Sequence, residues 1–481
     1  MRHRLTRVAW VTALAAVVGL PAVLAAWRVG GSVLGLLSTV LGLLALCLLV
    51  SVVVVPSRIR SLTAAFGVER VMGLHRWLGT LAVVVVALHM IVAVTSHPRL
   101  LDVLDASPAA QAGYGSELAL LLVGVAAVRG RRPGARYEIW ARLHVALSGV
   151  ALLLAGLHVF WLGSLISDPV MRAVLMVLVL ALVGVLVHRW VWRPLFSRQG
   201  AYVVYGTRRE SPTVSTLVLA PVHLRRGGLR FAPGQFVWLR LRRAVVGSEE
   251  HPFTIASSAG ITGRLELTVR DSGDFSGLLS TLSPGSKVWL DGPHGSFTAE
   301  AARGGDGLVL LAGGVGITPM MSMLRTLADR GDEREHRLVV AERGDEPLFA
   351  DELAAPGRRL HLQVTRTGGR RIDAAMLAEA LPGPEARDRL DYFVCGSPSL
   401  MAGSLAALEQ LGVPATRVHT EQFGWSGALP VADRVPATTA GDTAAAASPA
   451  GPMAGGAPLT PAALAGGPRH GRRPTGSHRA R

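Results

Sequence analysis

The sequence predicts a multi-pass bundle of six membrane helices, followed by an antiparallel β-barrel and then an α/β domain with a doubly wound parallel sheet. Six apolar stretches fill the first 198 residues, near 8–27, 32–55, 72–94, 116–128, 139–163 and 169–192. Short alternating strands separated by Gly and Pro turns come next, and strands then alternate with helices. We therefore expect four parts, at 1–198, 199–300, 301–429 and 430–481.

The six apolar stretches mostly approach the roughly 20 residues that cross a hydrocarbon core of about 30 Å. The fourth is short but can extend through the Gly113–Ser116 side. Fifteen of the 18 arginines in residues 1–198 lie at the N-terminus, in the second and fourth loops and after the last span. The positive-inside rule then places the N-terminus and the C-terminal module in the cytoplasm, at the cell membrane. A cleaved signal peptide over residues 1–26 is the alternative, and it leaves the other spans unchanged.

The formal net charge of +16 would ordinarily suggest a nucleic-acid partner. Residues 1–198 carry 18 arginines against 6 acids, residues 199–429 are balanced, and residues 430–481 carry 6 arginines against 2 acids. The excess therefore belongs to the membrane half and a tail, and we expect no nucleic-acid partner. The two cysteines, Cys47 and Cys395, are too few for a disulfide framework, a cysteine zinc site or an iron–sulfur cluster.

Four histidines lie at a matched spacing on the third and fifth apolar stretches. His75 and His89 are 14 residues apart, and so are His144 and His158. Fourteen residues advance a helix by about 1400°, within about 40° of the same face, and by about 21 Å along its axis. Because both stretches cross in the same direction, His75 is level with His144 (the inner pair) and His89 with His158 (the outer pair). This pattern predicts two bis-histidine iron sites, as for two stacked b-type haems.

A single intramembrane histidine is more often a hydrogen-bonded structural residue or a proton relay, but the duplicated spacing favours iron ligation. Gly79, Gly149 and Gly156 would let a porphyrin approach the backbone, although ordinary helix packing also uses such residues. His97 and His188 have no matched partner, and we interpret both as non-ligands. The six spans with two histidine pairs resemble the transmembrane domain of ferric reductases and NADPH oxidases.

Four motifs in the expected barrel resemble the flavin domain of the ferredoxin reductase superfamily: FAPGQFVWL (231–239), EHPFTIASS (250–258), VRDSGDFSGLL (269–279) and DGPHGSF (291–297). The HPFT form is the one that the ferric reductase and NADPH oxidase branch uses. The resemblance implies FAD binding by His251, Pro252, Phe253 and Thr254, with Thr254 at the redox edge of the flavin. It also makes Arg270 a phosphate or flavin partner, and it places Ser276 at a helix start that binds the pyrophosphate.

Two glycine-bearing turns follow strands of the expected α/β domain. The first, in AGGVGITPMMSML (312–324), offers Gly313, Gly314, Gly316, Ile317, Thr318 and Pro319 to a dinucleotide, with Thr318 capping the helix. The second offers Cys395, Gly396, Ser397 and Pro398. In the superfamily these turns flank the nicotinamide and its ribose phosphate, which implies a catalytic position for Cys395; a small buried residue is the alternative. Phe423 resembles the terminal aromatic residue that covers the flavin, with Trp425 as its competitor.

The choice between NADH and NADPH depends on residues after the second and third strands of this domain. Glu342 could accept a hydrogen bond from a ribose 2′-hydroxyl, whereas Arg343, Arg366, Arg370 and Arg371 could hold a 2′-phosphate. The arginines favour NADPH. Residues 430–481 are rich in Ala, Gly, Pro and Thr, and we expect a disordered tail that is either solvated or in contact with anionic lipid.

Together, the motifs predict an NAD(P)H-dependent transmembrane oxidoreductase that uses FAD and two b-type haems in the lipid bilayer. Its acceptor on the outer side would be a ferric chelate or dioxygen, and a protein partner is left open. The alternative is a non-enzymatic haem membrane protein that acts as a redox sensor or as an electron-transfer partner of another protein. Such a protein would have no use for the HPFT, GGVGITP and CGSP turns together.

Overall fold

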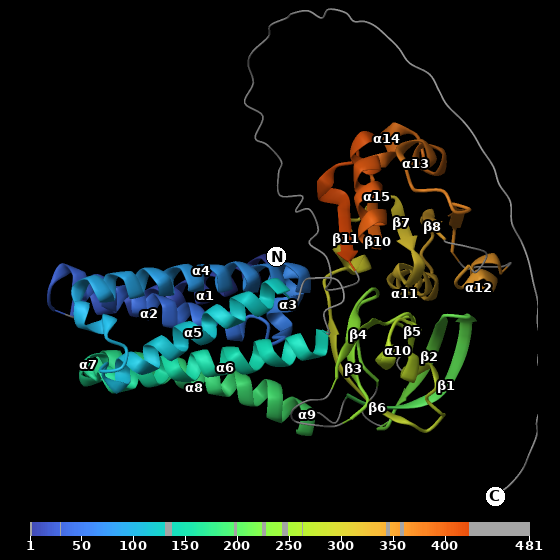
Figure 1. Cartoon of the computed structure of the whole chain (residues 1–481). Helices are drawn as coiled ribbons and strands as arrows, with labels where there is room; N and C mark the ends of the chain where they lie inside the picture. The colour runs from blue at the N-terminus through green and yellow to red at the C-terminus, as the bar shows by residue number, and fades with distance from the viewer. Residues whose placement is uncertain are drawn as a thin grey trace, which may run out of the picture. The chain divides into compact units, whose positions relative to one another are not determined.

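The computed structural model (Figure 1) describes residues 2–28, 30–129, 137–196, 200–223, 228–242, 249–261, 263–342, 347–355 and 360–422. Four of the predictions above concern Arg343, Phe423, Trp425 and the tail at 430–481, which lie outside the described residues.

Six long helices form the N-terminal bundle: α1 (Arg2–Arg28), α2 (Val33–Val54), α4 (Val68–Ser96), α5 (Pro108–Arg129), α6 (Tyr137–Leu162) and α8 (Pro169–Val187). Each is long and apolar enough to cross a membrane. The fourth span does extend past Gly113, because α5 begins at Pro108. Short helices connect or end the spans: α3 (Arg60–Phe66), η1 (Pro98–Leu101), α7 (Ser164–Ser167), the π-helical η2 (His188–Trp192) and α9 (Arg193–Phe196).

Neighbouring helices run alongside one another in pairs, with α4 on α2 and α6 on α5 (Figure 1). Leu48, Leu78 and Ala82 belong to the buried core of the bundle. In contrast, the side chains of Leu153 and Val177 are each 64% exposed on its surface. Apolar side chains that face outward from a helical bundle suit contact with lipid tails, and this chain is a multi-pass membrane protein.

The barrel has six strands: β1 (Ala201–Ser211), β2 (Val214–Pro221), β3 (Phe236–Arg240), β4 (His251–Thr254), β5 (Leu265–Arg270) and β6 (Lys287–His294). They follow the order β4-β3-β6-β1-β2-β5, antiparallel at every pair. A bridge from Ile255 to Leu267 joins the two edge strands and closes the barrel. Helix α10 (Asp274–Ser280) follows β5.

The α/β domain has a parallel sheet in the order β11-β10-β7-β8-β9. Its strands are β7 (Gly307–Gly313), β8 (His336–Ala341), β9 (Leu362–Arg366), β10 (Leu390–Gly396) and β11 (Val418–Gln422). Its helices are η5 (Ala299–Ala301), η6 (Gly314–Gly316), α11 (Ile317–Asp329), α12 (Ala350–Ala354), α13 (Ala374–Ala380), α14 (Pro384–Arg387), α15 (Pro398–Gln410) and η7 (Ala415–Arg417).

Helices cover both faces of this sheet because alternate side chains of each strand point to opposite sides. Along β7, Leu308 and Leu310 pack in the cluster that contains α11 and α12. Val309 and Leu311 pack in the cluster that contains α13 and α15. The predicted fold class is confirmed for the helical bundle, the antiparallel barrel and the parallel α/β domain.

Candidate functional site

The four matched histidines meet in two pairs inside the bundle. The ring centroids of His75 and His144 lie 6.1 Å apart, and those of His89 and His158 lie 6.3 Å apart. The rings cross at 70° in the inner pair and at 76° in the outer pair. The structure therefore brings together the partners that the 14-residue spacing matched.

Main-chain carbonyls of neighbouring helices fix three of these rings. Each Nδ1 contacts one carbonyl oxygen: His75 that of Val52 at 2.9 Å, His89 that of Ser38 at 2.9 Å and His158 that of Ala109 at 2.7 Å. A carbonyl oxygen can only accept, so Nδ1 carries the hydrogen and Nε2 keeps its lone pair. This is the tautomer in which an imidazole binds a metal through Nε2.

His144 is held differently from the other three. Its ring stacks on Trp140 with centroids 5.5 Å apart, and its buried Nδ1 has no hydrogen-bond partner within the described part of the chain. The inner pair thus combines one ring anchored by a carbonyl with one ring held by aromatic stacking.

Each pair has the separation that one shared iron requires. Centroid separations of 6.1 Å and 6.3 Å would suit an iron held between the two imidazoles. A metal–imidazole bond is about 2 Å long, and the bonding nitrogen is about 1 Å from its ring centroid. A Cβ added at Gly79, Gly149 or Gly156 would meet no described atom within 4 Å, so the backbone beside the histidines is open. These residues fit two haem irons.

Two further glycines contact the outer pair and were not predicted from the sequence to lie beside a histidine. A Cβ at Gly42 would lie 3.0 Å from the His89 ring, and a Cβ at Gly113 would lie 3.0 Å from the His158 ring. Both glycines lie on neighbouring helices, α2 and α5. Their small size lets α2 and α5 approach the histidines closely. In the sequence, these two glycines cannot be distinguished from small residues that serve ordinary helix packing.

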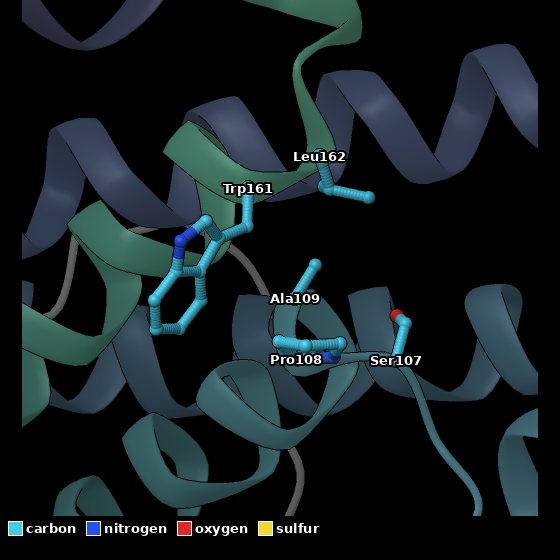
Figure 2. Close-up of a pocket in the computed structure, with 5 residues that line it drawn as sticks. All are labelled: Ser107, Pro108, Ala109, Trp161 and Leu162. Carbon is cyan, nitrogen blue, oxygen red and sulfur yellow. The ribbon is translucent and has the colours of Figure 1, made fainter.

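A pocket of about 550 Å³ lies between the start of α5 and the end of α6 (Figure 2). Its lining comes from the start of α5, with Ser107, Pro108 and Ala109, and from the end of α6, with Trp161 and Leu162. Ala109 links the pocket to the histidines, because its carbonyl is the one that His158 contacts. The five lining side chains are uncharged.

The HPFT segment forms β4, paired with β3 so that Thr254 lies opposite Phe236. Thr254 is buried, and its hydroxyl finds no hydrogen-bond partner among the residues that the structure describes. A buried hydroxyl without a partner is costly, and a flavin edge would supply one. Phe275 packs on this strand, with its ring centroid 4.2 Å from that of His251 and 6.5 Å from that of Phe253.

Ser276 lies in a local turn, whereas Arg270 reaches the α/β domain. The Ser276 hydroxyl accepts from the Ser272 N–H at 2.9 Å and donates to the Gly273 carbonyl at 3.0 Å, so it closes the turn before α10. Arg270 ends β5, and its guanidinium lies 3.0 Å from the position of a Cβ at Gly314. The structure therefore places Arg270 between the barrel and the glycine-rich turn.

The two predicted nucleotide turns meet at the carboxyl ends of β7 and β10, which are adjacent parallel strands. Gly314 has a φ of 56°, a left-handed value that favours glycine. A Cβ at Gly316 would lie 2.4 Å from the carbonyl oxygen of Cys395, so only glycine lets the turns approach this closely. Carboxyl ends of parallel strands are where α/β domains bind dinucleotides.

The N-cap of the helix after the first turn lies two residues before the predicted one. Its N-cap is Gly316, and the Thr318 hydroxyl donates to the Val315 carbonyl at 2.8 Å. The expected capping role of Thr318 is therefore wrong, because its hydroxyl satisfies a carbonyl of η6 rather than a free N–H. Ile317 and Pro319 are buried in the first turn of α11.

The second turn carries the cap that the first one lacks. The Ser397 hydroxyl accepts from the Leu400 N–H at 3.4 Å, and Pro398 occupies the first position of α15. Gly396 lies against the first turn, where a Cβ would be 3.4 Å from the Gly313 nitrogen. Cys395 is fully buried.

Three family models match this chain in the same order as its architectures. The ferric reductase like transmembrane component matches residues 41–155, the FAD-binding domain matches residues 217–298, and the oxidoreductase NAD-binding domain matches residues 310–405. The chain belongs to the ferric reductase and NADPH oxidase family. It accordingly carries an FAD-binding domain and an oxidoreductase NAD-binding domain behind a ferric reductase like transmembrane component.

Curated relatives share part of the length of this family member. A flavohemoprotein from Bordetella pertussis is 31% identical over 253 residues, which are 47% of this chain and 61% of that protein. The reductase component of propane 2-monooxygenase from Rhodococcus jostii is 28% identical over 236 residues, 45% of this chain and 62% of that one. The chain thus spans about three fifths of the length of these relatives.

A solved structure that matches a similar share of this chain is the flavohem-like FAD/NAD-binding domain of nitric oxide dioxygenase from Vibrio cholerae. It is 26% identical, covers 47% of this chain and 98% of that one, and has a TM-score of 0.40.

Glu342 and Arg366, which the sequence offered for opposite ribose preferences, form an ion pair with each other. They lie just after β8 and at the end of β9. Arg370 and Arg371 are exposed on the loop that follows β9. The Glu342 carboxylate, which would repel a 2′-phosphate, is therefore partly neutralised by Arg366. Arg370 and Arg371 follow Arg366 closely in the sequence.

Proposed function

We propose that this family member carries electrons from cytoplasmic NAD(P)H through FAD and two b-type haems to an acceptor on the outer side of the cell membrane. The observation that carries the proposal is the two level histidine pairs, 6.1 Å and 6.3 Å apart, in a bundle fused to FAD- and NAD-binding domains. When bound, the cofactors would supply hydride acceptance at the flavin and one-electron relay at the irons.

The chain's own residues would position these groups. His75 and His144 would hold the inner iron, and His89 and His158 the outer iron, about 21 Å further along the helices. Thr254 would offer its buried hydroxyl to the flavin edge. Cys395 would form the nicotinamide side of the nucleotide turns.

Arginine placement supports the orientation. The inner pair lies near the starts of α4 and α6, at the end of the bundle from which α9 leads to the barrel. Arg58, Arg60 and Arg70, which lie between α2 and α3, at the start of α3 and in the first turn of α4, are at this same end. Positively charged loops favour the cytoplasmic side, which would give the reductase module access to NAD(P)H.

We propose dioxygen as the acceptor rather than an anionic ferric chelate, because the pocket between the start of α5 and the end of α6 is lined by uncharged residues. Its serine, proline, alanine, tryptophan and leucine lining offers no cation to a chelate such as ferric citrate. We expect the anaerobically reduced protein to be reoxidised faster by oxygen than by ferric citrate at equal concentration. Faster reoxidation by ferric citrate in stopped-flow spectroscopy would assign the chelate instead.

The electron path is tested by anaerobic addition of NADPH to the purified, FAD-loaded protein. We expect the flavin absorbance to bleach and the haem Soret and α bands then to shift to their reduced forms. A flavin that bleaches while both haem bands stay oxidised would contradict the proposal.

Arg366 allows a test of nucleotide preference. In an Arg366→Ala variant, the Glu342 carboxylate loses its partner and is free to repel a 2′-phosphate. We expect the ratio of kcat/KM for NADPH to that for NADH to fall by about tenfold, the effect of about 1.4 kcal/mol. The matched control is Arg330→Ala, which removes an exposed ion pair with Glu300 and should leave the ratio unchanged. If the ratio is unchanged in both variants, the ion pair between Glu342 and Arg366 does not set the nucleotide preference.

A further inference from the structure

A buried cluster of charges joins the helical bundle to the flavin barrel. Arg58, between α2 and α3, pairs with Glu250, and Arg193, at the start of α9, pairs with Asp291 of β6. Arg189, in the π-helical turn after α8, places Nη2 3.3 Å from the Glu250 carboxylate. Arg189 is 6% exposed and Asp291 is 5% exposed, so water is largely excluded from these ion pairs.

Arginines of the bundle also contact uncharged groups of the barrel. The Arg60 guanidinium donates to the Gly292 carbonyl at 2.6 Å, and the Arg58 guanidinium lies 3.5 Å from the centre of the Trp238 ring on β3. A Cβ at Gly67, the N-cap of α4, would lie 2.7 Å from the Ser296 hydroxyl. The contact therefore extends from the loop after α2 to the N-cap of α4.

Each acid of this cluster is the first residue of a flavin motif. Glu250 directly precedes β4, whose four residues are HPFT, and Asp291 begins the DGPHGSF segment. On the bundle side, α4 carries His75 seven residues after its first residue, about 10 Å along the helix. The ion pairs thus connect the flavin strand to the helix end that leads to the inner histidine pair.

The charges of the cluster are unequal. Among the described residues, Glu250 and Asp291 face four guanidinium groups, which belong to Arg58, Arg189, Arg193 and Arg240. Burial alone would raise the pKa of Glu250, but the surrounding arginines hold it below its usual value, so the carboxylate stays ionised. Removing either carboxylate would leave buried cations without a counter-charge, which is strongly unfavourable.

We propose that Glu250 and Asp291 are positioning residues that dock the flavin barrel onto the bundle and so fix the gap between the bound flavin and the inner histidine pair. This rests on the electron path proposed above. Electron transfer slows steeply as the gap between donor and acceptor grows, whereas hydride transfer within the reductase module does not depend on docking. The two steps should therefore respond differently when an ion pair is lost.

The test uses the full-length protein loaded with FAD and haem and carrying Glu250→Gln or Asp291→Asn. Under anaerobic conditions, stopped-flow spectroscopy with NADPH follows flavin bleaching and haem reduction separately. We expect haem reduction to slow by about tenfold to a hundredfold, with flavin bleaching unchanged, because the loss of one partner of a buried ion pair favours the undocked state. The matched control is Glu249→Gln, since Glu249 is the exposed neighbour of Glu250 and should keep both rates.

A double variant tests docking against a general effect on folding. Arg193→Gln combined with Asp291→Asn removes one cation together with its acid, so we expect the double variant to reduce its haems faster than Asp291→Asn alone. A double variant that is as slow as the sum of its single variants, or that has lost its flavin, contradicts docking by this ion pair. Normal haem reduction in both Glu250→Gln and Asp291→Asn would also overturn the proposal. Failure of the wild-type protein to reduce its haems would instead refute the electron path.

Discussion

A His158→Ala variant is expected to bind one haem where the wild-type protein binds two, so that its haem-to-protein ratio falls by about half. The variant removes one of the two imidazoles of the outer pair, whose ring centroids are 6.3 Å apart, and leaves the inner pair intact. Flavin bleaching and inner haem reduction by NADPH should persist. Reoxidation by the outer acceptor should become the slow step.

The chain supplies a control for this substitution. His97 lies at the same end of the bundle, at the C-cap of α4, and is exposed without a facing histidine at the described positions. His97→Ala should therefore keep both haems and the wild-type reoxidation rate. Two haems in the His158→Ala protein, measured from the haem spectrum and the protein concentration, would disprove the assignment of the outer pair.

In a Gly316→Val variant, the rate of flavin reduction by NAD(P)H is expected to fall by about a hundredfold. A displacement of about 1 Å in the positions of reacting groups has an effect of that size. A Cβ at this position would lie 2.4 Å from the Cys395 carbonyl, so the two nucleotide turns would have to separate. Overpacking of this kind costs about 1–3 kcal/mol, which a folded domain can survive. FAD and haem contents should stay close to wild type, because the proposed FAD and haem sites lie in the barrel and in the helical bundle.

Gly383→Val is the control for that variant. Gly383 is exposed before α14, and a Cβ there would meet no described atom within 4 Å. Flavin reduction by NADPH should be unaffected, as measured by stopped-flow absorbance. If Gly316→Val also reduces its flavin at the wild-type rate, the first turn does not hold the dinucleotide.

The fold could be predicted because its signals are periodic or local. Apolar runs of span length mark α2 and α8, alternation marks β1 and β5, and Gly-rich turns mark the carboxyl ends of β7 and β10. The Thr318 cap was wrong for a local reason as well: a hydroxyl at a helix start can donate to a preceding carbonyl as readily as it can accept from an N–H. Sequence pattern does not distinguish these two uses.

The sequence alone determined which histidines share a face and a level, because helix geometry converts a spacing of 14 residues into a phase and a rise. Only the tertiary structure decided what surrounds them. The Ser38 and Ala109 carbonyls fix rings about 50 positions away, and Glu250 meets Arg58 across 192 positions. Such contacts depend on which helix or strand packs beside which, and the residue pattern of a single segment carries no record of its neighbours.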